Sequence, residues 1–171
     1  LKAILLDRWL INGRAGDVLP LADRGLSYGD GLFETIAVRA GHCRFLTTHL
    51  DRLTQGCIRL GIPVPDKQQL TAELEELVAS TLHATVKIII TRGEGPRGYR
   101  PPASCQPTRI VGIQSTNPIT PAIAGVRVRY CETLISRNPA LAGIKTLNRL
   151  EQVLARSEWD DEHVAEGLML N

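Results

Sequence analysis

The sequence is poor in aromatic residues and lacks long apolar runs, and each absence excludes a class of function. Aromatic side chains make up 4% of its 171 residues, and its lysines and arginines are scattered rather than gathered in a tract. Nucleic-acid-binding surfaces combine a basic stripe with aromatic side chains, so we expect no nucleic-acid partner. No run of about 18 apolar residues is present to span a membrane, and the apolar stretch in residues 1–8 is too short for a secretory signal. We therefore expect no membrane partner either.

Metal-ligand spacings are absent as well. No Cys-x-x-Cys pair occurs, and neither the cysteines nor the histidines recur at the short intervals of a zinc site. A chain without paired cysteines is typical of a reducing compartment, so we expect no metal and a cytoplasmic location. The cysteines are Cys43, Cys57, Cys105 and Cys131.

What the chain does contain is typical of a globular protein. Hydrophobic residues make up 43% and charged residues 22% of the sequence, and the formal net charge is +2. The length suffices for one domain plus part of a second. Anionic small-molecule substrates are compatible with this charge, because a few well-placed arginines can bind them.

Helical patterns predict two helices in the first half of the chain. The first covers residues 46–60, where leucines and Cys57 recur at helical intervals, and Gly61 is suited to end it. Asp66 can cap the second helix. Its inward-facing residues are Leu70, Leu74, Leu77 and Val78.

Alternating segments and turn residues predict two strand pairs beside these two helices, which makes the first domain α+β. In order, we expect a strand at 9–11 entering an Asn12-Gly13 hairpin turn, an extended segment at 18–21, a glycine-rich loop at 23–31, a strand at 32–38 turning at Gly41-His42, and strands at 86–91 and 109–115 on either side of a loop at 92–102.

A proline-containing stretch at 116–125 is typical of an interdomain linker. We therefore expect an N-terminal α+β domain at residues 1–115, the linker at 116–125, and the start of a second domain at 126–171. In this second domain, residues 126–131 alternate as a strand, and Leu147, Leu150 and Leu154 predict a third helix. The last residues, Gly-Leu-Met-Leu-Asn, predict a strand without a partner, so we expect the second domain to be incomplete.

Residues 137–152, RNPALAGIKTLNRLEQ, are the most informative segment. They place Lys145 just before the predicted third helix, with apolar neighbours on both sides. Partial desolvation disfavours the charged form of a lysine, so that it offers a free amine for Schiff-base formation. The spacing alone would also suit a solvated lysine at the start of a helix.

This segment resembles the cofactor-lysine motif of the class IV (fold type IV) pyridoxal-phosphate-dependent aminotransferase family, in the version found in its aminodeoxychorismate lyases. Three other segments are similar to family motifs in the same order: DRGLSYGDGLFET at 23–35, HLDRL at 49–53 and RGEGPRGY at 92–99. The resemblance covers nearly the whole chain from Trp9 onward. It implies a two-domain fold, in which a small α/β layer domain is followed by a larger β-rich domain.

The resemblance also implies roles for individual residues. Lys145 would hold pyridoxal 5'-phosphate and act as the catalytic base, and Arg52 would bind the cofactor phosphate. Arg97 and Tyr99 would face the substrate from a glycine-rich loop, which would otherwise be a mobile surface loop.

Tyr28, Phe33 and Asn148 complete the implied substrate-binding set. Tyr28 and Phe33 are equally suited to be core aromatics. Asn148 would lie one helical turn beyond Lys145 if the third helix included both residues.

The implied enzyme is a homodimeric lyase that eliminates across a carbon–oxygen bond. It would convert 4-amino-4-deoxychorismate to 4-aminobenzoate and pyruvate in folate biosynthesis. One alternative is a class IV aminotransferase acting on D-amino or branched-chain amino acids, which would share Lys145 and Arg52 but differ in the substrate loop. A second alternative is a catalytically silent fragment, because family enzymes pair the cofactor ring nitrogen with an acid that lies beyond Asn171.

Overall fold

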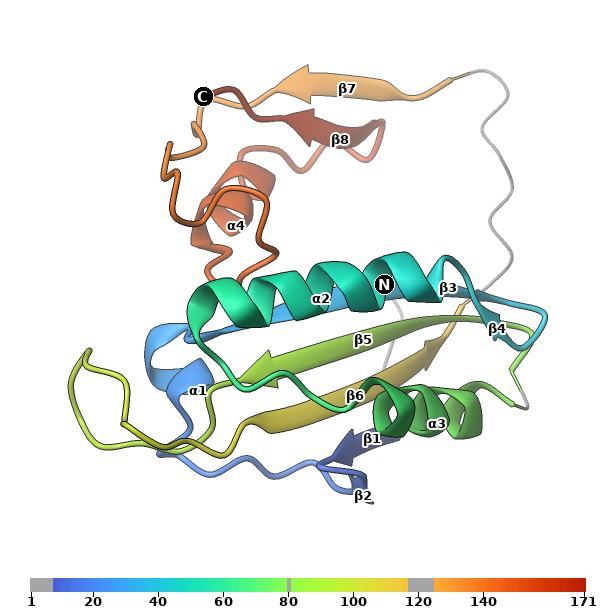
Figure 1. Cartoon of the computed structure of the whole chain (residues 1–171). Helices are drawn as coiled ribbons and strands as arrows, with labels where there is room; N and C mark the ends of the chain where they lie inside the picture. Colours follow the sequence, from blue (N-terminus) through green and yellow to red (C-terminus); the bar gives the residue numbers. More distant parts are fainter. Residues whose placement is uncertain (1–7, 80, 117–124) are drawn as a thin grey trace. The chain divides into compact units, whose positions relative to one another are not determined.

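The computed structural model describes residues 8–79, 81–116 and 125–171, and the chain divides into two compact units (Figure 1). Unit 1 comprises Leu1–Pro118 together with Ile144–Leu147, and unit 2 comprises Ile119–Gly143 and Asn148–Asn171. Most of the expected linker at 116–125 lies outside the described residues. The short segment that contains Lys145 therefore groups with unit 1, although its neighbours in the sequence belong to unit 2.

Unit 1 is built on a six-stranded antiparallel sheet with the strand order β2-β1-β6-β5-β3-β4. The predicted strands are present, and the sheet is larger than the two separate strand pairs we expected, because β1 also pairs with β6. The strands are β1 (Arg8–Ile11), β2 (Arg14–Ala15), β3 (Gly31–Arg39), β4 (His42–Cys43), β5 (His83–Thr91) and β6 (Thr108–Ser115).

The hairpin between β1 and β2 confirms the turn predicted from its sequence. Asn12 and Gly13 have φ angles of 51° and 80°, the left-handed pair that a type I′ turn requires. Residues 16–20, in contrast, form no strand, so the expected extended segment at 18–21 is not part of the sheet.

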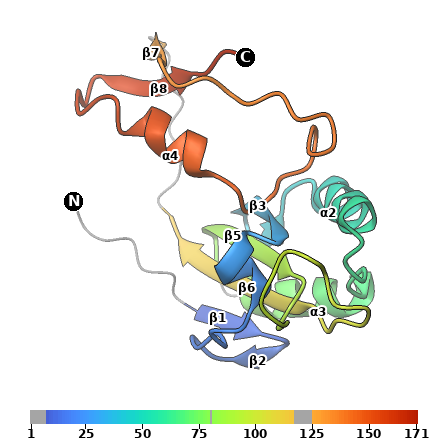
Figure 2. The same ribbon diagram turned by 90° about the vertical axis from the view of Figure 1, so that its left-hand side faces the viewer.

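Two helices, α2 (Leu46–Leu60) and α3 (Lys67–Val78), cover one face of this sheet (Figure 2). Both confirm the predictions: α2 ends at Gly61 with a φ angle of 62°, and the Asp66 side chain accepts hydrogen bonds from the first backbone amides of α3. The predicted inward residues of α3 are all buried. Each fully buried leucine contributes about 1.5–3 kcal/mol to folding, so these two apolar stripes hold the helices on the sheet.

The two faces of the sheet differ in character because side chains alternate along each strand. On β3, Leu32, Ile36 and Val38 point into the core under the helices, and Glu34 lies among them. The half-buried and exposed side chains between them, such as Phe33 and Thr35, lie on the opposite face, which we call the open face.

A short helix that the sequence did not predict, α1 (Arg24–Tyr28), lies inside the expected glycine-rich loop at 23–31. The Asp23 side chain caps it by accepting a hydrogen bond from the Gly25 amide at 2.8 Å, and Gly29 ends it with a φ angle of 62°. A single helical turn is too short to leave a periodic pattern in the sequence, which explains why it was missed.

Unit 2 contains two parallel strands, β7 (Arg127–Tyr130) and β8 (Val164–Leu168), and one helix, α4 (Leu150–Arg156). The strand at 126–131 and the third helix are confirmed, although Leu147 precedes the helix and the two leucines within it are exposed. Leu150 and Leu154 are 70% and 53% exposed, while Ala155 and Trp159 fill the small core of this unit. The expectation of an unpaired final strand is wrong, because β8 pairs with β7.

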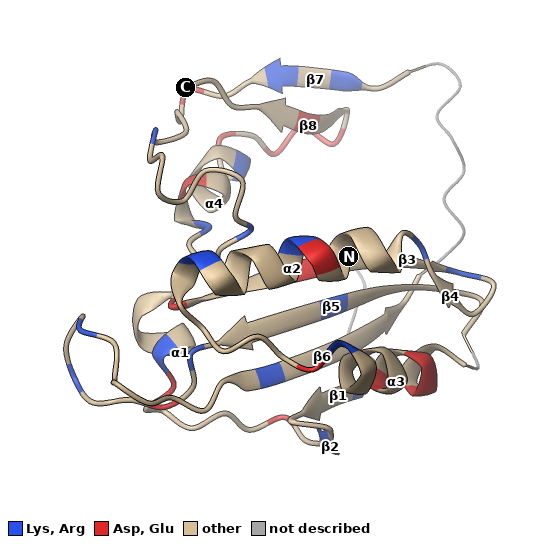
Figure 3. Cartoon of the chain, in the orientation of Figure 1, with Lys and Arg blue, Asp and Glu red and all other residues tan. Residues whose placement is uncertain are grey.

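Charge and hydropathy add two observations on the described part of the chain. Lysines and arginines are spread over helices, strands and loops (Figure 3), in agreement with their scattered positions in the sequence. None of the described helices is long and apolar enough to cross a membrane.

Candidate functional site

The segment that contains Lys145 is bound to the outer edge of β3 through its main chain. The Phe33 amide donates a hydrogen bond of 2.9 Å to the Lys145 carbonyl, and the Leu147 amide donates one of 3.0 Å to the Gly31 carbonyl. Strand β4 pairs only with the last two residues of β3, which leaves the beginning of the strand available. Residues from distant parts of the sequence are thereby held in one sheet.

This close approach depends on the glycine at position 31. A Cβ atom at Gly31 would lie 2.5 Å from the Ile90 carbonyl oxygen and 2.8 Å from Leu147 Cδ1. Both distances are far below ordinary van der Waals contact. A glycine is therefore required where the Lys145 segment, β3 and β5 meet.

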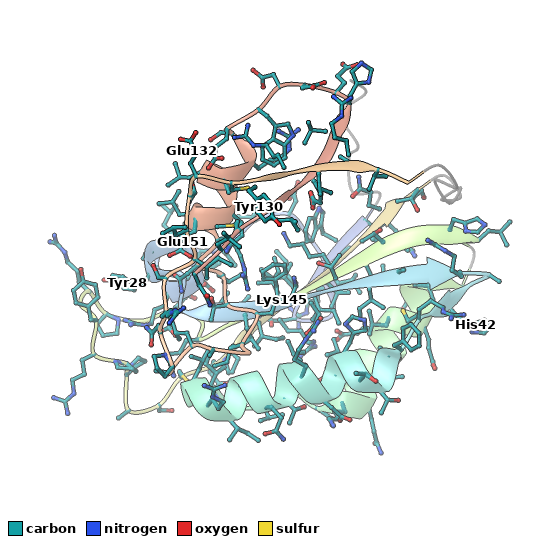
Figure 4. All side chains as sticks on the ribbon, turned by 90° about the horizontal axis from the view of Figure 1, so that it is seen from above. Tyr28, His42, Tyr130, Glu132, Lys145 and Glu151 are labelled. Carbon is teal, nitrogen blue, oxygen red and sulfur yellow. The ribbon has the colours of Figure 1, made fainter. Side chains whose placement is uncertain are left out.

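The added segment alternates like a strand, which directs the Lys145 side chain to the open face (Figure 4). Ile144 packs against the core and Thr146 is buried. Lys145 points the other way, with its Nζ atom 4.4 Å from the centroid of the Phe33 ring. The aromatic face attracts the ammonium group, so the amine is held in the partly apolar setting that the sequence predicted.

Arg52 on α2 is held by a buried carboxylate. Its Nε and Nη2 atoms each donate a hydrogen bond of 2.6 Å to Glu34, and His49 Nδ1 lies 2.8 Å from the same carboxylate. Glu34 is only 1% exposed, whereas the Arg52 side chain is 49% exposed. Among the described residues, no group bonds the remaining nitrogen of the guanidinium, Nη1, which can therefore bind an anion from solvent.

The protonation of this pair is set by opposing effects. Burial alone would raise the pKa of Glu34, but the hydrogen bonds and charges of Arg52 and His49 lower it below its usual value. The hydrogen bonds that Arg52 donates to Glu34 raise the pKa of Arg52 in turn. The pair is thus fully ionised near neutral pH, and Arg52 stays a cation.

Arg52 and Lys145 converge on the same edge of the sheet. Gly56 lies one helical turn after Arg52, on the same face of α2. A Cβ atom built at Gly56 would be 2.7 Å from Leu32 Cδ1 and 3.3 Å from Ile144 Cγ2. The helix that carries Arg52 therefore packs directly against the segment that carries Lys145.

The predicted substrate loop is held on unit 1 by Arg24 and Tyr28. The buried Arg24 guanidinium donates hydrogen bonds to the carbonyl oxygens of Gly98 at 2.9 Å and Tyr99 at 3.1 Å. The Gly98 amide donates to the Tyr28 hydroxyl at 2.8 Å, and the Tyr28 and Tyr99 rings meet edge to face. Arg97 projects from this loop and is exposed, while Tyr99 is 88% exposed.

Asp30 connects this loop to the helix of Arg52. Its Oδ2 atom accepts hydrogen bonds from Arg24 at 2.9 Å and from Arg92 at 2.8 Å. Arg92 also donates to the carbonyl oxygens of Leu60 and Gly61, at the end of α2. Burial would raise the pKa of Asp30, but the hydrogen bonds from the two arginines lower it. One ionised carboxylate therefore links the substrate loop to the end of α2.

The structure brings together some of the predicted residues. Lys145 lies beside Phe33, and Tyr28 lies beside Tyr99. Asn148 is exposed and belongs to unit 2. Residues 147–149 are not helical, since α4 begins only at Leu150, so the expectation that Asn148 lies one helical turn beyond Lys145 is wrong.

Three further residues shape the site and were not predicted: Glu34, Asp30 and Arg24. Glu34 did leave a signal in the sequence, because a carboxylate at an inward position of an alternating strand needs a buried partner. The loop contacts of Arg24 left no such signal, since they join its side chain to backbone carbonyls distant in the sequence.

Comparison with known proteins shows the family to which this chain belongs. The model of the family "Amino-transferase class IV" matches residues 31–171. The chain belongs to the class IV aminotransferase family. Enzymes of this family depend on pyridoxal phosphate, and the α+β fold that we expected, with its helices and antiparallel sheet, is the family's fold.

Individual relatives carry two kinds of name. An aminodeoxychorismate lyase of Vibrio harveyi is 36% identical over 94% of this chain and 60% of its own length. The crystal structure of 4-amino-4-deoxychorismate lyase from Pseudomonas aeruginosa is 51% identical, with a TM-score of 0.87 over 95% of this chain and 61% of its own. A D-alanine aminotransferase of Listeria monocytogenes is 25% identical over 97% of this chain and 58% of its own length. This chain thus spans about 60% of the length of the relatives that it matches.

The residues present suit the family's cofactor. A phosphate monoester needs a fixed cation with available donors, and Arg52 offers Nη1 while Glu34 holds the rest of its guanidinium. The cofactor aldehyde needs a lysine amine, and Lys145 presents Nζ from the same edge of the sheet. In a class IV enzyme these two residues would therefore hold the phosphate and the aldehyde carbon.

The Glu34→Gln substitution tests the buried pair. Glu34 has a lowered pKa in the folded state, so its contribution to stability is present above its usual value of 4.5 and is lost as the pH falls through the lower folded value. We expect Glu34→Gln to cost about 1–3 kcal/mol at pH 7, less than for a fully buried pair because Arg52 is half exposed. Urea unfolding from pH 7 to pH 3 measures this.

The matched control is Glu76→Gln on the exposed side of α3, which should change stability by less than about 0.5 kcal/mol. The stability of the wild type and of Glu34→Gln should converge below pH 4.5. A Glu34→Gln protein as stable as the wild type at pH 7 would contradict the role assigned to the pair.

Proposed function

We propose that the full-length protein is an aminodeoxychorismate lyase, which converts 4-amino-4-deoxychorismate to 4-aminobenzoate and pyruvate. The observation that carries this proposal is Lys145, bound to the edge of β3 within a segment that resembles the lyase motif. The likeness to two proteins named as this lyase, at 36% and 51% identity, supports the same choice.

Lys145 and Arg52 divide the work of binding the cofactor. Arg52 would hold the phosphate of the bound cofactor, and Lys145 would hold its aldehyde carbon. Pyridoxal phosphate, when bound, supplies an electron sink that stabilises negative charge next to the substrate nitrogen. The Phe33 ring packs against the Lys145 amine and helps to position it.

Lys145 then moves one proton. Its freed Nζ atom removes the proton from the ring carbon that bears the amino group, and the carbon–oxygen bond to the enolpyruvyl group breaks as the ring becomes aromatic. Nζ returns that proton to the methylene carbon of the leaving group, which yields pyruvate. The atoms of the substrate divide between the two products, so neither water nor an oxidant is consumed.

The substrate loop supplies the remaining contacts. Arg97 binds a carboxylate of the substrate, because a guanidinium forms paired hydrogen bonds with such a group. The proposed substrate-binding set is completed by Tyr99, Tyr28, Phe33 and Asn148. Arg24 keeps the loop in place through the carbonyl oxygens of Gly98 and Tyr99.

The proposed activity also bears on the pathway, the cellular location and the assembly of the protein. The product 4-aminobenzoate places the enzyme in folate biosynthesis, and the free cysteines are consistent with a reducing, cytoplasmic location. We propose a homodimer, as expected for class IV enzymes, and a division of the chain into domains at residues 1–115 and 126–171.

The activity itself is tested by offering two substrate sets to the full-length protein. With aminodeoxychorismate we expect 4-aminobenzoate and pyruvate in equal amounts, measured by chromatography. With D-alanine or branched-chain amino acids and 2-oxoglutarate we expect little amino transfer. Efficient amino transfer without 4-aminobenzoate would assign the protein to the aminotransferases, and neither activity would refute both assignments.

The identity of the cofactor lysine is tested by reduction. Borohydride treatment of the cofactor-loaded protein should fix the cofactor on Lys145, and mass mapping of peptides should find it there. The other lysines of the sequence are Lys2, Lys67 and Lys87, and peptide mapping distinguishes each of them from Lys145. An adduct on Lys87, which contacts the same Phe33 ring, would refute the assignment.

The two arginines should fail in different ways. Arg52→Ala should weaken cofactor affinity about ten- to a hundredfold, the value of a charge-assisted contact. Arg97→Ala should leave that affinity nearly unchanged and mainly raise KM for the substrate. Cofactor titration and steady-state kinetics on both variants measure this, and each variant is the control for the other. Equal loss of cofactor in both would show that the division of roles is wrong.

A further inference from the structure

A second lysine lies beside the cofactor lysine on the open face of the sheet. Lys87 is the only charged residue of β5, and its Nζ atom lies 5.3 Å from the centroid of the Phe33 ring. The Nζ atom of Lys145 lies 4.4 Å from the same centroid. One phenyl ring thus contacts both amines.

The sheet register explains this arrangement. Phe33 on β3 lies opposite Ile89 on β5, and Lys87 lies opposite Thr35. Lys87 is therefore the diagonal neighbour of Phe33 on the same face, a spacing that a long side chain can bridge. The bound Lys145 segment brings the second amine to the ring from the other edge of β3.

Lys87 is half-buried on the open face of the sheet. Its side chain makes no ion pair with any of the described residues. Lys67, a described lysine of unit 1 that lies outside the site, differs from Lys87. It is exposed and pairs with Asp51 at 2.7 Å. A half-buried cation beside a second amine is stabilised when an anion binds between or next to them.

The proposed substrate supplies such an anion. Each of its two products, 4-aminobenzoate and pyruvate, carries a carboxylate, so the substrate carries two. Arg97 can bind only one of them from its loop. We infer that Lys87 is a substrate-binding residue that holds a carboxylate of aminodeoxychorismate beside Lys145, an inference that rests on the proposed function.

Kinetics of Lys87 variants in the full-length, cofactor-loaded enzyme test this. Lys87→Gln should raise KM about ten- to a hundredfold, the value of one charge-assisted contact, while kcat changes only a few-fold. Lys87→Arg should recover most of the loss because it restores the charge. Cofactor content and absorbance spectrum should match the wild type in both variants.

Inhibition by each product shows which carboxylate is bound. In Lys87→Gln, inhibition by either 4-aminobenzoate or pyruvate should weaken by a factor similar to that for KM. Lys67→Gln is the matched control and should change neither KM nor inhibition. Lys87→Met keeps the apolar stem, so it replaces Lys87→Gln if that variant is unstable.

Several results would overturn the inference. An unchanged KM, a loss of cofactor in Lys87→Gln, or unchanged inhibition by both products would each show that Lys87 does not hold the substrate. The wild type tests the proposed function separately, by forming 4-aminobenzoate or not. If it transfers amino groups instead, the same variants are compared for the KM of the amino-acid donor, whose carboxylate Lys87 would then hold.

Discussion

The site depends on two main-chain hydrogen bonds at the edge of β3. Phe33 and Gly31 pair with Lys145 and Leu147, and this pairing brings a residue from late in the chain to the sheet of unit 1. The strand-like alternation that follows determines where each side chain goes. Ile144 enters the core, and Lys145 extends over Phe33 on the open face. Without this pairing, Lys145 would have no defined position relative to Arg52.

Two carboxylates, buried Glu34 and half-buried Asp30, hold the cations around this edge. Glu34 takes two donors of Arg52, so that the guanidinium is oriented before any anion arrives. Asp30 bonds Arg24 and Arg92, which reach the substrate loop and the end of α2. Such preorganisation reduces the cost of ordering side chains when a ligand binds. The fold thus compensates the charges of Arg52, Arg24 and Arg92 with two carboxylates of its own.

Lys87 is the exception that the sequence did not reveal. It stands in an apolar run, where a lysine on the outward side of a strand is unremarkable as a solvated residue. Only the sheet register places it diagonally across from Phe33 and next to Lys145. The chemical consequence is a half-buried cation beside Lys145 on one aromatic ring, which is the basis for the substrate-binding role inferred for Lys87.

Local patterns predicted the parts of the fold that depend on local physics. The Asn12-Gly13 turn, the stripe of α2 and the cap at Asp66 follow from backbone geometry and helical periodicity, and all three are present. Long-range pairing left no local trace, so the six-stranded sheet was underestimated. The leucine spacing predicted α4 correctly, but spacing shows only that a helix has a stripe. The surroundings decide whether that stripe is buried, and Leu150 is 70% exposed.

The family resemblance identified Lys145, Arg52 and Phe33 as candidate site residues. It did not identify the residues that hold these side chains and the neighbouring loop in place. Glu34 and Asp30 both lie in the segment at 23–35 that resembles a family motif, yet most of the side chains that pair with them come from other elements. A carboxylate on an inward strand position indicates that some cation must reach it, without indicating which one. The sequence therefore could not predict which side chains pair across different elements of the fold.

Amide hydrogen exchange in the cofactor-free, full-length protein tests the edge pairing most directly. Exchange reports how often each hydrogen bond opens, and the absence of cofactor removes any protection that binding would add. The amides of Phe33 and Leu147 should exchange together and slowly, close to the rate of Ile90 inside the sheet. A Leu147 amide that exchanges as fast as those in the loop around Arg97 would show that the Lys145 segment is not held on β3, and would contradict the account of the site.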